Sequence, residues 1–293
     1  MSEGKKPFDT ISNMYEGFNK EEVVKETKFI TDDLEDIFES TCHTKGLRWR
    51  LNSLNKSVGS LRKGNFIVVF ARVESGKTSF LSSEVTHMAI QAKSPILWVN
   101  NEQEGKAVKS RLYQASLGCT LAKLYSDRPR AYEEYIKRTG GRIKLFDDAT
   151  ASKIQIESLC KELNPSLIVI DQIDKIKGFS DDRNDLRLGK IYIWAREISK
   201  QYAPLIGICQ ASGEAEGRKW LTMEHMADSK TSKPAEADVI IGIGKVNDIG
   251  METIRFLNII KNKLPQDSDS SPEMRHAKFE VRFDESTARY IDL

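Results

Sequence analysis

Short runs of apolar residues recur along the chain and alternate with segments of helical periodicity. The runs are apolar throughout rather than at every second position. This pattern is typical of strands that are covered on both faces, as in a parallel sheet between two layers of helices. The pattern therefore predicts an α/β fold with a mainly parallel central sheet. The predicted strands are Phe66–Ala71, Pro95–Asn100, Arg142–Phe146, Ser166–Asp171, Pro204–Gln210 and Asp238–Gly244.

The two ends of the chain follow different patterns. Apolar residues at helical spacing between Lys20 and Ser40 predict an amphipathic helix. We expect this helix to belong to an N-terminal segment, residues 1–45, that precedes a core of residues 46–293. Near the C-terminus, "TIRFLNIIKNK" and "AKFEVRFDESTARYIDL" alternate apolar and polar residues. They predict an antiparallel extension of the sheet, with a final hairpin around Asp284 to Thr287.

Composition adds limits to this picture. The 293 residues are 39% hydrophobic and 30% charged, which is enough for a substantial core. Lys and Arg number 45 against 43 Asp and Glu, for a net charge of +2, so any nucleic-acid-binding surface must be local. The four cysteines show no C-x-x-C spacing, which favours neither a zinc site nor a disulfide framework. No apolar run is long enough to cross a bilayer, and we expect a cytoplasmic protein without a membrane partner.

The first predicted strand runs directly into "ARVESGKTS" at residues 71–79, and a helical pattern follows. The segment matches the phosphate-binding pattern G-x-x-x-x-G-K-[ST], except that alanine replaces the first glycine. In a strand–loop–helix unit, backbone N–H groups and the helix N-terminus converge on phosphate oxygens. Lys77 is expected to reach the β and γ phosphates of ATP, and Thr78 to hold Mg²⁺. The residues expected to bind ATP are Ala71, Arg72, Val73, Glu74, Ser75, Gly76, Lys77, Thr78 and Ser79.

Three polar residues at strand ends are candidates for the chemistry of this loop. Asp171 ends an apolar strand and is expected to bind Mg²⁺ through water. Glu102 follows the strand that we expect beside the loop strand, where a carboxylate could orient the attacking water. Gln210 ends another strand, where its amide could sense the γ-phosphate. Three further carboxylates near strand ends, Asp147, Asp148 and Asp174, are interpreted as helix caps.

Taken together, these segments resemble the DnaB-type hexameric replicative helicases. "LNSLNKSVGSLRKGNFIVVFARVESGKTSF" is similar to the family's entry segment, whose loop begins Ala-Arg and ends Gly-Lys-Thr, so Ala71 is the usual residue there. By the same resemblance Glu102 matches the catalytic glutamate, Asp171 the Walker B aspartate and Gln210 the γ-phosphate sensor. The resemblance covers about residues 46 to 290. It implies a RecA-like P-loop NTPase core that uses ATP and Mg²⁺ and assembles into a ring, most simply a hexamer.

Two segments depart from the family pattern. Bacterial members carry a Lys-x-Arg pair in a late strand, and its arginine reaches the nucleotide of the neighbouring subunit. "IIKNKL" offers Lys261 and Lys263 instead, and lysine is a point charge where arginine is a bidentate donor. "HMADSKTSKPAEAD" matches the family pattern only loosely. The chain looks like the stripped-down helicase cores encoded by phages, in which case its location is the host cytoplasm, and we expect the N-terminal helix to dock on a neighbouring subunit.

Single-stranded DNA is expected to contact the segment that follows Gln210. Basic residues there alternate with glycine and small polar residues, as in flexible loops that follow a phosphate backbone without reading bases. Acidic residues dilute the charge, so an ordinary solvated loop is the alternative. A second candidate lies after Asp171, with Arg183 and Arg187. The residues expected to bind DNA are Arg218, Lys219, Lys230 and Lys233.

The sequence therefore predicts an ATP-dependent DNA helicase that translocates on single-stranded DNA as a ring, with a primase or polymerase of the replisome as further partners. Two alternatives stay open. One is a recombination ATPase with the same core, which would form filaments. The other is a loader or regulator that binds ATP but hydrolyses little, which the two lysines in place of Lys-x-Arg keep open.

Overall fold

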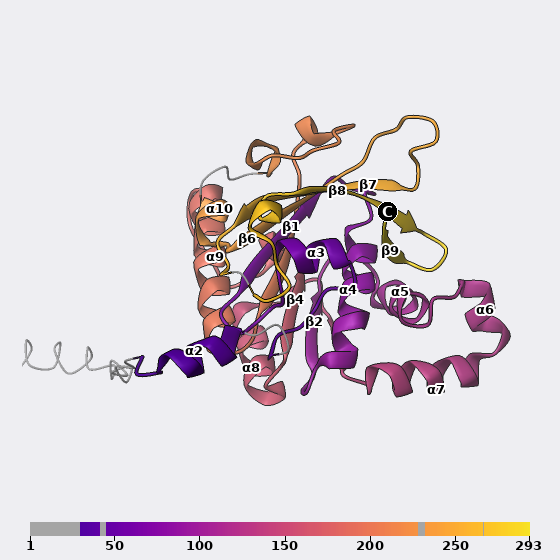
Figure 1. Cartoon of the computed structure of the whole chain (residues 1–293), viewed down its shortest axis with the longest axis horizontal. Helices are drawn as coiled ribbons and strands as arrows, with labels where there is room; N and C mark the ends of the chain where they lie inside the picture. Colours follow the sequence, from indigo (N-terminus) through magenta and orange to yellow (C-terminus); the bar gives the residue numbers. More distant parts are fainter. Residues whose placement is uncertain (1–29, 42–44, 228–231, 266) are drawn as a thin grey trace, which may run out of the picture. The chain divides into compact units, whose positions relative to one another are not determined.

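A computed structural model describes residues 30–41, 45–227, 232–265 and 267–293, and Figure 1 shows the helices and strands that they form. The chain divides into two units, Met1–Ile37 and Phe38–Leu293. Helix α2 (Leu34–Thr41) overlaps the predicted helix Lys20–Ser40, whose residues 20–29 are outside the described part of the chain. The domain boundary between residues 45 and 46 stays a prediction.

The second unit is built on a nine-stranded sheet in the order β3-β2-β4-β5-β1-β6-β7-β8-β9. Neighbouring strands from β3 to β6 are parallel, and those from β6 to β9 are antiparallel. The α/β fold, the six apolar strands and the C-terminal hairpin are thus confirmed. The strands are β1 (Phe66–Ala71), β2 (Ile96–Asn100), β3 (Ile143–Asp147), β4 (Leu167–Asp171), β5 (Leu205–Gln210), β6 (Val239–Gly244), β7 (Ile254–Asn262), β8 (Lys278–Asp284) and β9 (Arg289–Asp292).

Helices cover both faces of the parallel strands β1, β2, β4, β5 and β6, which explains why these strands are almost entirely apolar (Figure 1). Helices α4 and α5, with the segment before β1, pack on one face, and α8 and α9 pack on the other. The helices of this unit are α3 (Asn52–Ser57), α4 (Lys77–Gln91), α5 (Gly105–Leu117), α6 (Leu121–Ser126), α7 (Arg128–Thr139), α8 (Lys153–Leu163), α9 (Asn184–Gln201) and α10 (Ser232–Glu236). Short 3₁₀ turns are η3 (Ile173–Lys175), η4 (Gly213–Ala215), η5 (Met223–His225) and η6 (Pro272–Met274).

One prediction about strand order is wrong. The strand before Glu102 does not lie beside the loop strand, because β1 pairs with β5 and β6, whereas β2 pairs with β3 and β4. Two later strands, β4 and β5, separate β2 from β1. The strands are parallel, however, so all their carboxyl ends lie at one edge of the sheet, and Glu102 still faces the loop after β1.

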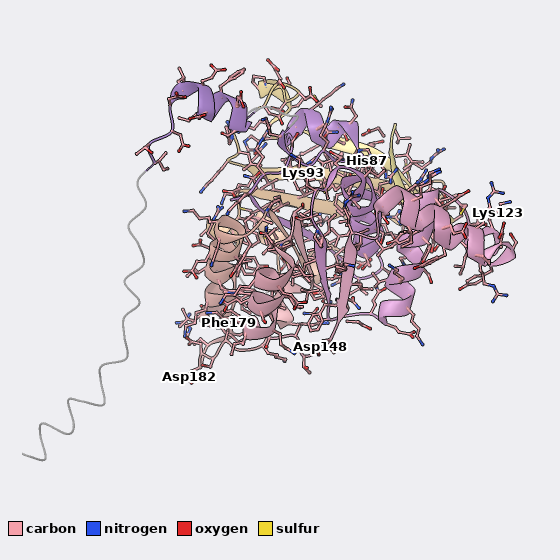
Figure 2. All side chains as sticks on the ribbon, turned by 90° about the horizontal axis from the view of Figure 1, so that it is seen from below. His87, Lys93, Lys123, Asp148, Phe179 and Asp182 are labelled. Atoms are coloured by element: carbon pink, nitrogen blue, oxygen red, sulfur yellow. The ribbon has the colours of Figure 1, made fainter. Side chains whose placement is uncertain are left out.

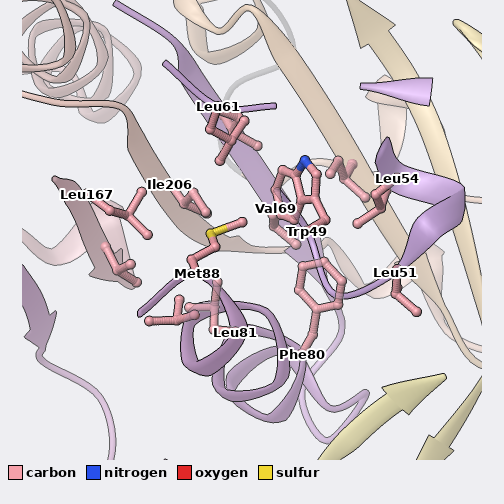
Figure 3. Close-up of a cluster of buried hydrophobic side chains, with 14 of the residues drawn as sticks. Trp49, Leu51, Leu54, Leu61, Val69, Phe80, Leu81, Met88, Leu167 and Ile206 are labelled. Atoms are coloured by element: carbon pink, nitrogen blue, oxygen red, sulfur yellow. The ribbon is translucent and has the colours of Figure 1, made fainter. Parts of the chain in front are cut away.

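The helix that follows the loop is anchored in the core through its apolar face. Figure 3 shows Phe80 and Met88 of α4 against side chains from β1, β5 and the segment before β1. The rings of Trp49 and Phe80 lie 6.4 Å apart. Burying each such side chain stabilises the fold by about 1.5–3 kcal/mol. The start of α4, where the loop ends, is therefore held in place by the packing of the helix behind it.

Helices α6 and α7 extend beyond α5 to one side of the sheet (Figure 1). Lys123 of α6 stands at the outer margin of the molecule in Figure 2. This projection keeps α6 away from the loop after β1. Within the described part of the chain, no helix combines the length and apolar character that a membrane span requires.

Lys233 is not placed to contact DNA, which corrects one predicted site residue. Its side chain is completely buried, and its ammonium donates to Asp174 Oδ2 at 2.6 Å and to the Ala227 carbonyl at 2.8 Å. Asp174 also accepts a hydrogen bond from the Tyr192 hydroxyl at 3.1 Å. Asp174, interpreted from the sequence as a helix cap, thus forms a buried ion pair instead. The pair ties the segment after β5 to the turn after β4.

We expect Lys233→Ala to destabilise the fold by about 3 kcal/mol, because removing one partner leaves the Asp174 charge largely buried and unpaired. Urea unfolding monitored by circular dichroism measures this loss. Arg183→Ala is the matched control, since Arg183 pairs with Asp185 on the exposed surface and its loss should leave the midpoint unchanged. Normal stability of the Lys233 variant, combined with weaker DNA binding, would contradict the burial argument.

Candidate nucleotide-binding site

The loop between β1 and α4 holds its carbonyl groups by contacts within the chain. Lys77 donates from Nζ to the carbonyls of Ala71 and Arg72, at 3.2 and 2.9 Å. Arg255 of β7 donates from Nε to the Ser75 carbonyl at 3.0 Å. A peptide whose carbonyl is held on one side presents its N–H on the other. The loop is therefore organised to offer backbone donors to an anion.

Gly76 is required by the close approach of β9 to this loop. Its φ is +91°, and a Cβ at this position would lie 2.7 Å from the Tyr290 hydroxyl. That hydroxyl donates to the carbonyls of Ser75 and Gly76, at 3.3 and 3.2 Å. The C-terminal extension thus supports the loop directly. The sequence reasoning missed Tyr290 and Arg255, because no local pattern links the late strands to a loop near residue 75.

Asp171 and Thr78 form the part of the site that suits a divalent cation. Asp171 has no exposed surface, and its Oδ2 accepts a hydrogen bond from Thr78 Oγ1 at 3.2 Å. Its Oδ1 has no hydrogen-bond partner among the described residues. Burial, together with the nearby charge of Glu102, raises the pKa of Asp171 to about 6. A buried carboxylate with an unused oxygen beside a threonine hydroxyl fits the oxygen ligands that Mg²⁺ prefers.

Lys77 lies in the same low-dielectric environment. Burial lowers the pKa of its ammonium, and the carboxylates of Glu102 and Asp171 oppose that shift. Lys77 therefore lies close enough to Glu102 and Asp171 for their charges to affect its pKa. The three residues, from β1–α4, β2–α5 and the end of β4, meet as the sequence predicted.

Two glutamine side chains hold the carboxylate of Glu102. Gln172 Nε2 donates to Glu102 Oε2 at 2.8 Å, and Gln210 Nε2 donates to Glu102 Oε1 at 3.3 Å. The structure therefore brings Gln210 and Glu102 together, as expected from their places at strand ends. Gln172 was missed, although its position directly after Asp171 at a strand end was a usable signal.

The backbone around Glu102 is held by Asp147, at the end of β3. Asp147 accepts hydrogen bonds from Asn100 Nδ2 at 2.5 Å and from the N–H of Gly105 at 2.9 Å. The interpretation of Asp147 as a cap of the next helix is wrong, because that helix is capped by Ser152. Asp147 instead binds the first residue of α5, in the neighbouring strand–helix unit. The loop from Asn100 to Gly105 is thus fixed at both ends.

A cavity of about 910 Å³ opens beside these groups. Its size is within the range of pockets that enclose small ligands. One part is lined by Glu102 and by loop residues Val73, Glu74, Gly76, Lys77, Thr78 and Ser79. Another part is lined by Arg111, Gln114 and Arg255. The turn between β8 and β9 contributes Glu285 and Ala288. The cavity can hold a nucleotide whose phosphates lie at the loop.

Lys261 and Lys263 lie at the opposite edge of the sheet from the loop. The N–H of Lys263 donates to the Asp238 carbonyl, and the N–H of Asp238 donates to the carbonyl of Phe66 at the start of β1. Because β1 has six residues at about 3.3 Å each, its two ends are roughly 17 Å apart. A lysine at this edge cannot reach the phosphates bound by its own loop.

The two lysines differ in their surroundings. Lys261 donates to the carbonyls of Pro234 and Ala235 in α10, and burial, with the charge of Lys263, lowers its pKa to about 8. Lys263 is exposed. A register shift in the pairing of β7 with β6 precedes Lys261, and such bulges redirect the side chains that follow.

The segment after β5 presents two of the four residues expected to bind DNA. Arg218 and Lys219 are exposed, whereas Lys233 is buried and Lys230 lies outside the described residues. Trp220 packs edge-on against Phe256, at 5.3 Å between centroids. The second candidate for DNA contact is the segment after Asp171, and its two arginines already have partners. Arg183 pairs with Asp185 at 2.7 Å, and Arg187 donates to the Asp174 carbonyl at 3.2 Å.

The segment after β5 also contacts the phosphate loop. Arg72 pairs with Glu216 at 3.0 Å and donates to the Ala211 carbonyl at 3.3 Å. Because Ala211 follows Gln210 directly, the loop, the strand end and the exposed basic residues form one connected region. A movement of the segment after β5 would therefore change the contacts of Arg72 in the phosphate-binding loop.

Comparisons with known proteins identify a family and a relative. The family described as "DnaB-like helicase C terminal domain" matches residues 46–261. Replicative DNA helicase DnaB of Mycoplasma pneumoniae is 25% identical over 300 residues, which cover 93% of this chain and 62% of that protein. The chain thus spans less than two thirds of the length of this curated relative.

Two solved structures share the fold. One, described as an ATPase domain, matches with a TM-score of 0.73 at 16% identity, over 99% of this chain and 100% of that one. A DnaB-like replicative helicase, described with its interactions with primase, matches with a TM-score of 0.74 at 16% identity, over 98% of this chain and 72% of that one. The mainly parallel sheet and its flanking helices therefore form a RecA-like fold. Because the match covers residues 46–261, this chain belongs to the family of DnaB-like helicase C-terminal domains.

Proposed function

We propose that this chain is an ATP-driven DNA helicase that forms a ring, most simply a hexamer, and translocates on single-stranded DNA to separate duplex. The observation that carries the proposal is that Lys77, Thr78 and Glu102 line one cavity. Behind them, Asp171 accepts a hydrogen bond from Thr78, and Gln210 donates one to Glu102. Membership of the DnaB-like family supports it, and favours a helicase over a recombination ATPase.

In the proposed reaction each side chain has one task. N–H groups of the loop after β1 and of the first turn of α4 bind the phosphates of ATP, and Lys77 exchanges its two carbonyl contacts for phosphate oxygens. Thr78 and Asp171 would hold Mg²⁺, which supplies positive charge to the phosphates when bound. Glu102 orients the attacking water as general base. Gln210 leaves Glu102 to donate to the γ-phosphate and returns when that phosphate departs.

Single-stranded DNA is proposed to lie along the segment after β5. Arg218 and Lys219 are its exposed cations, and the Arg72–Glu216 pair connects the segment to the phosphate loop. Contacts of this kind bind the phosphate backbone without base preference. Loss of the γ-phosphate at the loop would therefore change the position of the DNA contacts.

The subunit arrangement is proposed from two features. Lys263 is exposed at the edge opposite its own loop, so the charge it supplies would serve the nucleotide of a neighbouring subunit. Helix α2 carries Leu34 and Phe38 exposed among acidic residues. A groove of about 720 Å³, with Lys63 and Lys93 among its lining residues, offers the opposite charge on a second copy. We propose that α2 docks there.

A primase interaction is described for one of the solved relatives. We propose a primase or polymerase of the replisome as a partner here too, together with a cytoplasmic location. A weakly hydrolysing loader is the alternative that the turnover measurements below exclude or support.

Replacing both Arg218 and Lys219 with Ala should weaken binding to single-stranded DNA and leave ATPase activity without DNA nearly intact. Each lost phosphate contact lowers the slope of log affinity against log salt by about 0.7, so the pair should lower it by about 1.4. Fluorescence anisotropy with labelled oligonucleotide at several salt concentrations measures the slope. Lys123→Ala with Arg128→Ala removes the same charge from α6 and α7 and should leave it unchanged. An unchanged slope in the first variant would place the DNA elsewhere.

Mixing two inactive variants tests whether the site is shared between subunits. Lys77→Ala has a defective loop but a good Lys263, and Lys263→Ala has a good loop but lacks the trans charge. Where the first variant presents Lys263 to the intact loop of the second, a complete site forms again. DNA-stimulated turnover of the mixture should therefore exceed the mean of the two variants assayed alone, once mass spectrometry shows that subunits exchange. Turnover equal to that mean, with exchange demonstrated, would rule out the trans role of Lys263.

A further inference from the structure

We propose that Gln172 is a positioning residue that holds Glu102 ready for catalysis, an inference that rests on the proposed role of Glu102 as general base. Gln172 donates from Nε2 to Glu102 Oε2 at 2.8 Å. Glu102 itself is exposed. An exposed glutamate loses rotamer entropy when it is held in one conformation. A donor that holds it in advance removes that cost from the catalytic step.

Gln172 is itself fixed in place from several directions. The residue is only 2% exposed, and its φ is +63°, in the left-handed region that non-glycine residues rarely adopt. Its carbonyl accepts hydrogen bonds from Asn101 Nδ2 at 3.2 Å and from the N–H of Lys175 at 3.0 Å. The turn after β4 therefore presents this amide in one orientation.

The two amides on Glu102 have different freedom. Gln210 is partly exposed at the end of β5, and its contact with Glu102 Oε1 is longer, at 3.3 Å. It can turn to a phosphate without breaking packed structure. Gln172 is buried and its contact is short. Gln210 is thus the amide that exchanges partners, and Gln172 is the one that stays.

This division leaves Glu102 able to act as a base. A carboxylate offers about four lone-pair positions on its two oxygens. With Gln172 on Oε2, departure of Gln210 frees Oε1 to accept a proton from water. The backbone beneath is held by Asp147, through Asn100 and Gly105. The carboxylate is therefore fixed at one oxygen and open at the other at the moment when the γ-phosphate is bound.

Gln172→Asn tests the proposal with little change in backbone preference, because asparagine also tolerates positive φ. The amide is kept, but it is withdrawn by about 1.5 Å, one C–C bond length, and no longer reaches Glu102. We expect kcat for ATP with saturating single-stranded DNA to fall about tenfold, the scale of one hydrogen bond to a charged group. KM for ATP should stay within about twofold, since the phosphate contacts are untouched.

The same substitution in a Glu102→Gln background separates positioning from a general effect on the fold. If Gln172 acts through Glu102, the double variant should have the kcat of Glu102→Gln alone. A further tenfold loss in the double variant, or an unchanged kcat in the single variant, overturns the proposal. Gln172→Gly, which also tolerates positive φ, takes the place of the asparagine variant if that protein does not fold.

Two further measurements keep the outcomes distinct. Gln155→Asn is the matched control, because it makes the same change in a glutamine that caps α8. It should leave kcat unchanged. Turnover by Glu102→Gln itself reports on the proposed function. Full turnover in that variant defeats the assignment of Glu102. A loss of about a hundredfold there, with normal kcat in Gln172→Asn, defeats only the role of Gln172.

Discussion

The buried carboxylate of Asp171 is the constraint on which the nucleotide site depends. It lies at the end of β4 without exposed surface, and one of its oxygens has no hydrogen-bond partner among the described residues. A buried charge is stable only where opposite charge or hydrogen bonds compensate for lost water, and Thr78 supplies a single hydrogen bond. Its raised pKa, about 6, reflects that deficit. A divalent cation bound beside Asp171 would remove the deficit. Two groups of the site therefore favour ligand binding. The Asp171 carboxylate lacks full charge compensation, and Lys77 contacts only carbonyls of its own loop, which phosphate oxygens can replace.

The grouping of the chemical residues could be predicted from sequence because it follows from one rule of parallel sheets. Each of Lys77, Glu102, Asp171 and Gln210 lies at or shortly after the carboxyl end of an apolar run, and such ends meet at one edge. The rule holds whatever the order of the strands. This explains why Glu102 was expected near the loop correctly even though β2 is not the neighbour of β1. Strand order depends on which crossover connections pack best, and no local pattern records that.

What escaped prediction is the partner of each polar side chain. Lys233 stands in a polar, basic segment whose pattern predicts exposure, yet it is buried against Asp174, 59 residues earlier in the chain. The place of Asp147 predicts a cap of the helix that follows it, but it binds the neighbouring unit through Gly105. Tyr290 belongs to a predicted terminal hairpin and supports the phosphate loop. In each case local spacing predicts the secondary structure, while the contact is decided by packing between segments that are distant in sequence.

Strand β7 links the edge of the sheet at the nucleotide site to the opposite edge. Near its start, Arg255 holds the Ser75 carbonyl of the loop in the same subunit. Past its other end, Lys263 stands at the opposite edge of the sheet, beside Asp238. Because β7 is antiparallel to β6, the strand runs from the nucleotide edge to the far edge, a direction opposite to that of the parallel strands β1 to β6. In the proposed ring, a single strand would therefore contact its own phosphate loop at one end and the nucleotide of a neighbour at the other. This arrangement would couple adjacent sites, because Arg255 lines the cavity of its own subunit while Lys263 would supply charge to the nucleotide of the neighbour.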